Sequence, residues 1–226
     1  MATDHLQPLS WKEDIPLKLQ LALDDITLED ALELTAGLRS YVDIVEIGSP
    51  FIIEEGMRPV RAFRERFPEL EVLADTKIMD AGDYEAAQTF EAGAHYCTVL
   101  GVTDTGTVEG CLKAAQRYGR SVFVDMICVP DIPARVAELE GIGVRHLGVH
   151  TGVDQQAQGR TPLEDLALMR NSSALSQISV AGGIAPATIG SFVELGADVV
   201  IVGGGITKAA DPIAAARELH NAIKTA

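Results

Sequence analysis

The feature that most restricts the fold of this chain is a regular alternation of short apolar runs with amphipathic stretches. The apolar runs have the length of strands and cover Leu17–Leu23, Asp43–Ile47, Glu71–Ala74, Tyr96–Leu100, Ser121–Val124, His146–Val149, Ile178–Val180 and Asp198–Val202. Between them, apolar residues recur at helical intervals, as in Leu28–Arg39, Gly56–Phe67, Tyr84–Ala92, Thr107–Tyr118, Ile132–Leu139 and Pro186–Leu195. Repeated strand and helix units of this kind predict a parallel sheet.

The number of runs and the chain length favour a closed barrel over an open sheet. A chain of 226 residues is about what an eight-fold α/β barrel needs. Hydrophobic residues make up 47% of the chain and aromatic residues only 5%, which suits a core of small and branched side chains. We therefore predict one α/β domain, a (β/α)8 TIM barrel over residues 17–226. Residues 1–16 are expected to form a short N-terminal arm, with Trp11 as a candidate to dock on the barrel.

Three glycines support the repeat. Gly93, Gly143 and Gly196 each stand where a helix should end in a left-handed cap before the next strand. We expect a positive φ angle at each of them.

Charge and cysteine content exclude several classes of partner. The formal net charge of −15 repels nucleic acid and anionic lipid surfaces. The first fourteen residues contain no apolar run, so we expect neither a signal peptide nor a membrane anchor there. Cys97, Cys111 and Cys128 form no Cys-x-x-Cys pair, and we interpret them as reduced thiols of a cytoplasmic protein. A small anionic substrate remains compatible with the charge, because local amides and cations can outweigh a distant field.

Polar residues follow nearly every expected strand. In a TIM barrel these positions meet at one face, where catalysis takes place. Crowded carboxylates repel each other and must be offset by cations, so stability alone does not explain them. The positions are Asp24, Glu46, Asp75, Lys77, Asp80, Asp125, His150, Gly182 with Gly183, and Gly203 with Gly204 and Gly205.

The segment Asp75-x-Lys77-x-x-Asp80 is the centre of this set. In an extended segment, residues two apart project to the same side, so Asp75 and Lys77 should face one cavity and pair with each other. Such a pair would keep Lys77 protonated as an acid or electrophile. Asp80 lies past the strand, on a loop that could reach a second protomer. The alternative is a surface salt-bridge cluster, which would add little stability.

Glu46 and Asp75 end neighbouring strands and are the candidate metal ligands. Two carboxylates, with water and substrate completing the coordination, suit Mg²⁺, and Mn²⁺ is a candidate substitute. The alternative is that Glu46 only pairs with Lys77.

His150 directly follows an apolar strand and could transfer a proton near neutral pH. Its alternative is a passive, hydrogen-bonded histidine. The other histidines, His5, His95, His146 and His220, lie in a tail, at strand starts and in the last helix, where we expect structural roles.

Glycines follow the seventh and eighth strands. Gly182, Gly183, Gly203 and Gly204 offer backbone amides that no side chain obstructs, which is how this fold usually holds a phosphate. Turns use glycines as well, so a purely structural interpretation stays open.

These residues lie in segments that resemble the orotidine-monophosphate decarboxylase superfamily, whose hallmark is Asp-x-Lys-x-x-Asp at the third strand. Within it, the chain is most similar to the group of hexulose-phosphate synthases and keto-gulonate-phosphate decarboxylases. The similarity runs from about Leu17 to the C-terminal helix. It rests on residues 21–24 (LALD), 45–48 (VEIG), 74–82 (ADTKIMDAG), 98–101 (TVLG), 124–127 (VDMI), 149–152 (VHTG) and 181–183 (AGG).

The resemblance implies an aldolase-type lyase that condenses formaldehyde with ribulose 5-phosphate to a hex-3-ulose 6-phosphate through a Mg²⁺-stabilised enediolate. It implies metal binding by Glu46 and Asp75, with Lys77 stabilising the oxyanion and His150 transferring a proton. Asp24 and Asp125 would bind and orient the sugar, and the glycine turns its phosphate. Which group accepts the first proton stays open. The resemblance also implies a homodimer in which Asp80 enters the partner's site.

Decarboxylation of 3-keto-L-gulonate 6-phosphate is the alternative on the same scaffold. Decarboxylases of the group carry Glu where this chain has Asp125, Arg where it has Gly204, and Arg shortly after the histidine, where it reads Thr151-Gly152-Val153. These departures favour the aldol reaction. From another class, a non-catalytic sugar-phosphate sensor would be expected to have a degenerate rim, and this rim is intact.

Overall fold

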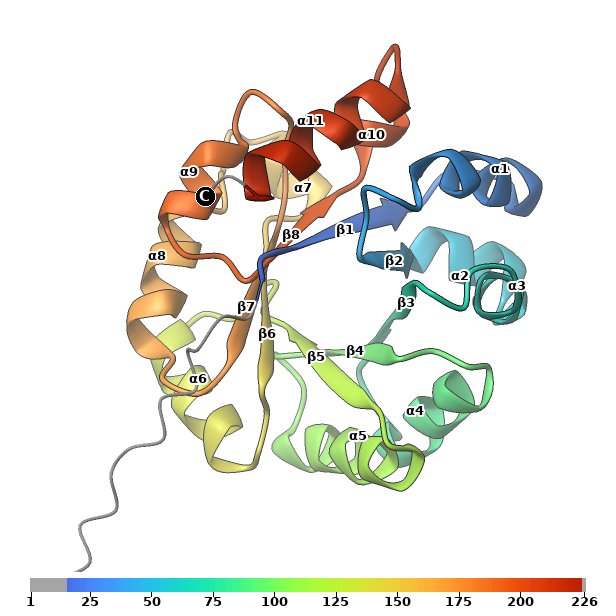
Figure 1. The fold of residues 1–226 in the computed structure, drawn as a ribbon. Helices are drawn as coiled ribbons and strands as arrows, with labels where there is room; N and C mark the ends of the chain where they lie inside the picture. Colours follow the sequence, from blue (N-terminus) through green and yellow to red (C-terminus); the bar gives the residue numbers. More distant parts are fainter. Residues whose placement is uncertain (1–15, 225–226) are drawn as a thin grey trace, which may run out of the picture.

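The structure is a computed structural model that describes residues 16–224. Eight parallel strands close into a barrel in chain order, with helices around the outside (Figure 1). The expected (β/α)8 barrel is therefore confirmed. Apart from Pro16, the expected N-terminal arm and Trp11 lie outside the described residues.

The strands that form the barrel are β1 (Lys18–Leu23), β2 (Ile44–Ile47), β3 (Glu71–Ile78), β4 (Tyr96–Leu100), β5 (Ser121–Asp125), β6 (His146–His150), β7 (Gln177–Ala181) and β8 (Val199–Val202). The helices are α1 (Leu28–Leu38), α2 (Ser49–Glu55), α3 (Arg58–Arg66), α4 (Gly82–Glu91), α5 (Thr105–Tyr118), α6 (Ile132–Gly141), α7 (Val153–Gln156), α8 (Leu163–Ser172), α9 (Ile189–Glu194), α10 (Gly204–Thr207) and α11 (Pro212–Lys224).

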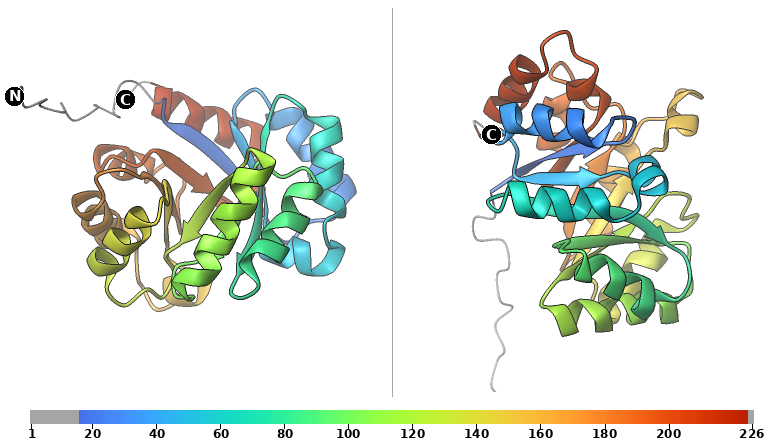
Figure 2. Two further views of the ribbon diagram at one scale, coloured as in Figure 1. Left: turned by 90° about the horizontal axis from the view of Figure 1, so that it is seen from below. Right: turned by 90° about the vertical axis from the view of Figure 1, so that its right-hand side faces the viewer.

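Closure of the barrel depends on β1, which pairs in parallel with both β2 and β8. Figure 2 shows β1 and β2 running in the same direction when the molecule is seen from its side. Because every ladder is parallel, the carboxyl ends of all the strands meet at one mouth of the barrel.

The buried residues form two layers. The larger core lies between the strands and the surrounding helices, since helices and strands both contribute to it. A second cluster comes from strands alone and fills the barrel interior, with Ile44, Leu73, Phe123 and Val199 at its centre. The ring of His146 stacks on that of Phe123 with centroids 4.7 Å apart. The interior below the mouth is thus packed, and the polar inward positions lie above it.

One expected boundary is wrong, and one helix was not expected from the sequence. The third strand does not end at Ala74 but continues to Ile78, because a hydrogen-bonded bulge keeps it beside β4. The helix expected over 56–67 is α3, and a separate helix, α2, precedes it. Gly56 has a φ of 60°, which breaks the helical path between them.

The expected glycine caps are confirmed, with φ angles of 104° at Gly93, 101° at Gly143 and 80° at Gly196. Each turns the chain from a helix into the next strand.

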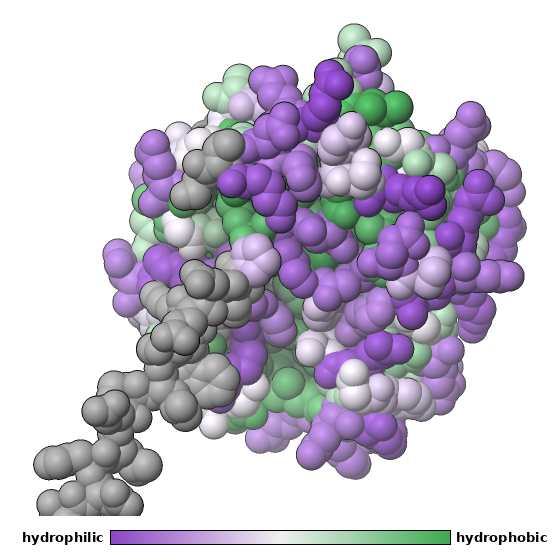
Figure 3. Space-filling model, in the orientation of Figure 1, coloured by the Kyte–Doolittle hydropathy of each residue, from purple (hydrophilic) through white to green (hydrophobic). Residues whose placement is uncertain are grey.

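The face seen in Figure 3 is mostly hydrophilic, with scattered hydrophobic residues. Within residues 16–224, no helix is both long and apolar enough to cross a membrane.

Candidate active site

Four of the expected site residues lie on the inner face of the barrel at its carboxyl mouth. Glu46, Asp75, Asp125 and His150 come from β2, β3, β5 and β6. Successive residues of a strand alternate between its two faces, so each shares the inner face with the residue two places before it. Those earlier residues are Ile44, Leu73, Phe123 and Gly148. The packed interior therefore sets the floor of the site.

Lys77 enters the same space through a bulge in β3. Ala74 is opposite Cys97 and Ile78 is opposite Val99, so three residues of β3 face Thr98 alone. Lys77 has a φ of 46°, a left-handed conformation that is uncommon for a residue with a side chain. The expected pairing of Asp75 with Lys77 is present, but simple alternation in an extended strand is the wrong explanation for it.

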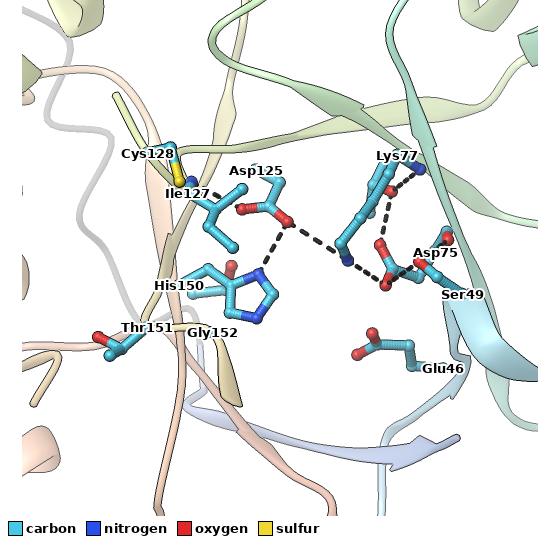
Figure 4. Close-up of polar contacts among 12 residues, drawn as sticks. Glu46, Ser49, Asp75, Lys77, Asp125, Ile127, Cys128, His150, Thr151 and Gly152 are labelled. Carbon is cyan, nitrogen blue, oxygen red and sulfur yellow. Dashed lines mark hydrogen bonds and ion pairs between the residues drawn. The ribbon is translucent and has the colours of Figure 1, made fainter. Parts of the chain in front are cut away.

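The Lys77 ammonium forms an ion pair with Asp75 Oδ2 and lies 3.5 Å from Asp125 Oδ2 (Figure 4). Burial by itself lowers the pKa of Lys77, but the charges of Asp75, Asp125 and Glu46 outweigh it and the net pKa is above the usual value. Lys77 is therefore held as a cation between two carboxylates. The cluster lies in the barrel mouth, so the alternative of a surface salt-bridge cluster is wrong.

Asp75 is fixed from two sides. Ser49 Oγ lies 2.8 Å from Asp75 Oδ2 and 2.7 Å from the Asp75 carbonyl oxygen. Thr98 Oγ1 donates a hydrogen bond of 2.8 Å to Asp75 Oδ1. Each carboxylate oxygen of Asp75 thus has a protein hydroxyl group within hydrogen-bond distance.

His150 Nδ1 lies 2.9 Å from Asp125 Oδ2, and the Ile127 amide donates to Asp125 Oδ1 over 2.9 Å. Burial raises the pKa of Asp125, but the hydrogen bond and charge of His150, together with Lys77, bring it below the usual value. An ionised Asp125 favours a proton on Nδ1, which leaves Nε2 as the ring nitrogen that can accept a proton.

Glu46 does not pair with Lys77, so that alternative is wrong. Instead, Gln20 Nε2 donates a 2.6 Å hydrogen bond to Glu46 Oε2. Burial and then the nearby charge of Asp75 raise the pKa of Glu46 to about 8. Burial and the charge of Asp75 also raise the pKa of Asp24, whose carboxylate lies against Gly48. The mouth holds more negative charge than Lys77 neutralises.

This shortage of positive charge fits a hard cation at Glu46 and Asp75. Buried Gln20 also leaves its Oε1 atom without a hydrogen-bond partner beside Glu46. Among the described residues, no group of three or more acidic, His or Cys side chains is arranged to hold a metal. An ion held by Glu46 and Asp75 would therefore have two carboxylate ligands from the protein and would leave its remaining positions to water and substrate.

The two glycine turns lie side by side above β7 and β8. Gly182 and Gly183 have φ angles of 125° and 66°. A Cβ atom on Gly182 would lie 2.9 Å from the Thr151 carbonyl oxygen, and one on Gly205 would lie 2.4 Å from that of Ile184. Neighbouring backbone therefore excludes a side chain at Gly182 and Gly205, whereas a Cβ atom on Gly203 or Gly204 would have no atom nearer than 3.6 Å.

A cavity of about 430 Å³ opens on the His150 side of the mouth. Its walls include Met126, Cys128, Gln155 and Arg160, from the segments that follow β5 and β6. There is room for a small molecule next to His150.

Asp80 is not in contact with this network. It is exposed on the segment after β3, and its Oδ1 accepts a 2.7 Å hydrogen bond from the Ala81 amide. Within one chain, Asp80 therefore adds nothing to the Lys77 site.

The remaining histidines of the described chain have structural contacts. His95 Nδ1 accepts a 2.8 Å hydrogen bond from the Val72 amide, and His220 Nδ1 lies 2.9 Å from the Tyr41 carbonyl oxygen. Burial lowers the pKa of both His95 and His146 to about 4. His5 lies outside the described residues.

Three polar residues near the site are absent from the sequence prediction: Gln20, Ser49 and Thr98. Gln20 and Thr98 interrupt apolar strands, and Ser49 follows the strand end at Ile47. A polar residue inside a run that must be buried was the available signal.

A closed (β/α)8 barrel whose carboxyl mouth holds carboxylates, a lysine and a histidine has the features of a barrel enzyme. The chain belongs to the orotidine 5'-phosphate decarboxylase / HUMPS family, whose model matches residues 17–219. This confirms the resemblance predicted from the sequence.

Three relatives narrow the group. The chain is 44% identical to the 3-hexulose-6-phosphate synthase of Bacillus subtilis (strain 168) over 207 residues, which is 92% of this chain and 99% of the relative. It is 50% identical to the solved 3-hexulose-6-phosphate synthase from Salmonella typhimurium, with a TM-score of 0.91. The match covers 92% of this chain and 99% of the solved one. A solved structure of KGPDC from Streptococcus mutans is 26% identical to this chain, with a TM-score of 0.86. The match covers 94% of this chain and 99% of the solved one. The expectation of an enzyme is confirmed by these synthase relatives.

Proposed function

We propose that this protein catalyses the 3-hexulose-6-phosphate synthase reaction, the condensation of formaldehyde with D-ribulose 5-phosphate to D-arabino-hex-3-ulose 6-phosphate. The observation that carries the proposal is the connected network in which Lys77 lies between Asp75 and Asp125, and Asp125 also holds His150. Relatives at 44% and 50% identity that bear the name of this activity support it.

The reaction removes a proton from C1 of the ketose and forms a bond from C1 to the formaldehyde carbon, whose oxygen then takes up a proton. His150 is the proposed group for proton transfer, because its Nδ1 contact with Asp125 fixes the ring and leaves Nε2 available. Lys77, held protonated, would stabilise negative charge on a reacting oxygen.

Glu46 and Asp75 would hold Mg²⁺, or Mn²⁺ in its place. When bound, such an ion polarises the ketose oxygens and stabilises the negative charge that develops there. We expect a chelator such as EDTA to abolish activity and added Mg²⁺ to restore it. Full activity in chelator would remove Glu46 and Asp75 from this role.

The sugar would be positioned by groups away from the reacting carbon. The amides of Gly182, Gly183, Gly203 and Gly204 would bind the phosphate, while Asp24 and Asp125 would orient hydroxyl groups. Binding energy from the remote phosphate would then help to place C1 beside His150 and Lys77.

A homodimer with shared sites is part of the proposal. Asp80 is exposed and free of the network of its own chain, and the exposed apolar side chains of Met79 and Tyr84 flank it. We propose that this segment packs on a second copy and brings Asp80 to the partner's site.

The free thiols Cys97, Cys111 and Cys128 support a cytoplasmic location.

A decarboxylase of 3-keto-L-gulonate 6-phosphate is the second candidate, favoured by the structural similarity to KGPDC. Its lower identity of 26% and the residues at 125 and 204 rank it below the synthase reaction. A sugar-phosphate sensor without turnover ranks third, because no residue of the catalytic set is missing.

One assay separates these candidates. Purified protein is incubated with ribulose 5-phosphate, formaldehyde and Mg²⁺, and the loss of formaldehyde is followed beside a Lys77→Ala control. We expect loss with the wild-type protein only; equal loss in both would overturn the proposal. Faster release of CO₂ from 3-keto-L-gulonate 6-phosphate than consumption of formaldehyde would reverse the ranking. Tight binding of ribulose 5-phosphate without turnover would favour the sensor.

A further inference from the structure

Thr98 on β4 occupies an unusual position opposite the bulge of β3. The two strands pair regularly at Ala74 with Cys97, and again at Ile78 with Val99. Between these pairs, the three residues Asp75, Thr76 and Lys77 have only Thr98 across from them. The regular ladder cannot satisfy all the backbone groups of such a bulge, so other groups must do so.

Thr98 fills this role with both its side chain and its backbone. The Lys77 amide donates to Thr98 Oγ1 over 2.8 Å, and Thr98 Oγ1 in turn donates to Asp75 Oδ1 over 2.8 Å. The Thr98 carbonyl oxygen accepts from Thr76 Oγ1 over 2.9 Å. One buried hydroxyl thus contacts the two site residues of the bulge at once.

Both contacts bear on geometry that the backbone alone does not favour. Lys77 has a φ of 46°, which a residue with a Cβ atom rarely adopts unless its surroundings hold it there. Asp75 must present its carboxylate in a fixed orientation beside the Lys77 ammonium (Figure 4). A single hydroxyl that accepts from one and donates to the other ties the two orientations together.

We propose that Thr98 is a positioning residue for the reaction: its hydroxyl holds the β3 bulge in the conformation that places Asp75 and Lys77 together in the mouth. Thr98 acts through these two residues and not on the substrate. The inference rests on the proposed function for its effect on catalysis, while its structural part can be measured without turnover.

Thr98→Val tests the proposal, because valine keeps the shape of threonine and removes the hydroxyl. Thr98→Ser keeps the hydroxyl and should restore function. Thr89→Val is the matched control: Thr89 is also buried, but it lies on α4 and donates only to the Glu85 carbonyl oxygen. We expect Thr98→Val to lower kcat about 10- to 100-fold with little change in KM for ribulose 5-phosphate. Thr98→Ser and Thr89→Val should keep kcat within about threefold of the wild type.

Hydrogen exchange of the Lys77 amide provides a measurement that does not involve catalysis. Without its acceptor at residue 98, this amide should exchange about tenfold faster in Thr98→Val than in the wild type, Thr98→Ser or Thr89→Val. If Thr98→Val does not fold, Thr98→Cys replaces it, since a thiol of similar size is a weak donor and acceptor.

Unchanged kcat and unchanged Lys77 exchange in a folded Thr98→Val or Thr98→Cys protein would overturn the proposal. So would a variant that loses stability but retains wild-type kcat below its unfolding temperature, because that result would describe a merely structural threonine. Failure of the wild-type protein to consume formaldehyde would instead count against the proposed function, and the exchange measurement would still decide whether Thr98 holds the bulge.

Discussion

At the scale of single residues, the mouth of the barrel is governed by charge balance. Burial, and after it the charge of Asp75, raise the pKa of Glu46 to about 8. Lys77 is the cation that lies between Asp75 and Asp125 in this network. Asp125 differs from Glu46, because His150 and Lys77 keep its pKa below the usual value. The neighbours of these two carboxylates thus shift their pKa values in opposite directions, upward for Glu46 and downward for Asp125.

The raised pKa of Glu46 predicts a pH dependence of stability in metal-free protein. The folded state binds the proton of Glu46 more tightly than the unfolded state, whose pKa is near 4.5. Its contribution to the free energy of unfolding is therefore fully present below the unfolded pKa, declines as pH rises, and is lost above about pH 8. We expect Glu46→Gln to reduce this decline, as measured by urea unfolding in EDTA at several pH values. Identical pH profiles for the two proteins would contradict the assignment.

Asp125→Asn tests the role of the Asp125 carboxylate. The substitution keeps the shape but removes the charge that favours a proton on His150 Nδ1, so the ring is no longer held in the useful tautomer. We expect kcat to fall by about 10²- to 10⁴-fold, by analogy with the loss of an aspartate that orients a catalytic histidine. Steady-state kinetics on protein shown to be folded by thermal unfolding would measure it. A kcat close to that of the wild type would mean that His150 does not depend on Asp125.

At the scale of elements, α4 and α5 pack together at the point where the β3 segment leaves the mouth. Gly82 begins α4, and a Cβ atom there would lie only 2.0 Å from the Thr107 carbonyl oxygen of α5. A Cβ atom on Gly106, near the start of α5, would have no other atom within 4 Å. The close approach of α5 therefore excludes a side chain at Gly82, whereas no neighbouring atom excludes one at Gly106.

Alanine substitutions should separate these two cases. We expect Gly82→Ala to lower the free energy of unfolding by about 1–3 kcal/mol, because the helices must move apart. Gly106→Ala should raise it by about 0.5 kcal/mol through the reduced entropy of the unfolded chain. Urea unfolding of both variants provides the comparison. Equal effects would show that the close approach of α4 and α5 does not constrain Gly82.

At the scale of the whole molecule, the barrel collects its site residues at one mouth but leaves Asp80 outside the network. The proposed dimer gives this residue a function, since its segment also exposes Met79 and Tyr84. If the sites are shared between two chains, two variants that are each inactive can form a mixed dimer with one intact site.

Mixing two inactive variants should restore activity if Asp80 serves the partner's site. In a mixed dimer of Lys77→Ala with Asp80→Ala, one site carries both changes and the other carries neither. We expect random mixing to recover about a quarter of wild-type activity, because half of the dimers are mixed and each has one intact site. Formaldehyde consumption after co-refolding would be measured, with each variant refolded alone as the control. No recovery, in a sample shown to contain mixed dimers, would exclude the shared site.

The sequence by itself determined the barrel and the chemical types at its mouth. Strand-length apolar runs between amphipathic helices have few ways to bury themselves, and a parallel barrel brings every strand end to one face. Glu46, Asp125 and His150 could therefore be predicted as neighbours from their positions after strands. The cap glycines Gly93 and Gly143 followed from local backbone geometry in the same way.

Only the tertiary structure decided how Asp75 and Lys77 meet. The sequence suggested an extended strand, whereas the chain forms a bulge with Lys77 in a left-handed conformation. The reason is physical: Thr98, on a different strand and more than twenty residues away, accepts a hydrogen bond from the Lys77 amide and donates one to Asp75, and these bonds support a conformation that local preferences disfavour. Local sequence determines which residues reach the mouth, but contacts between distant strands determine their orientation there.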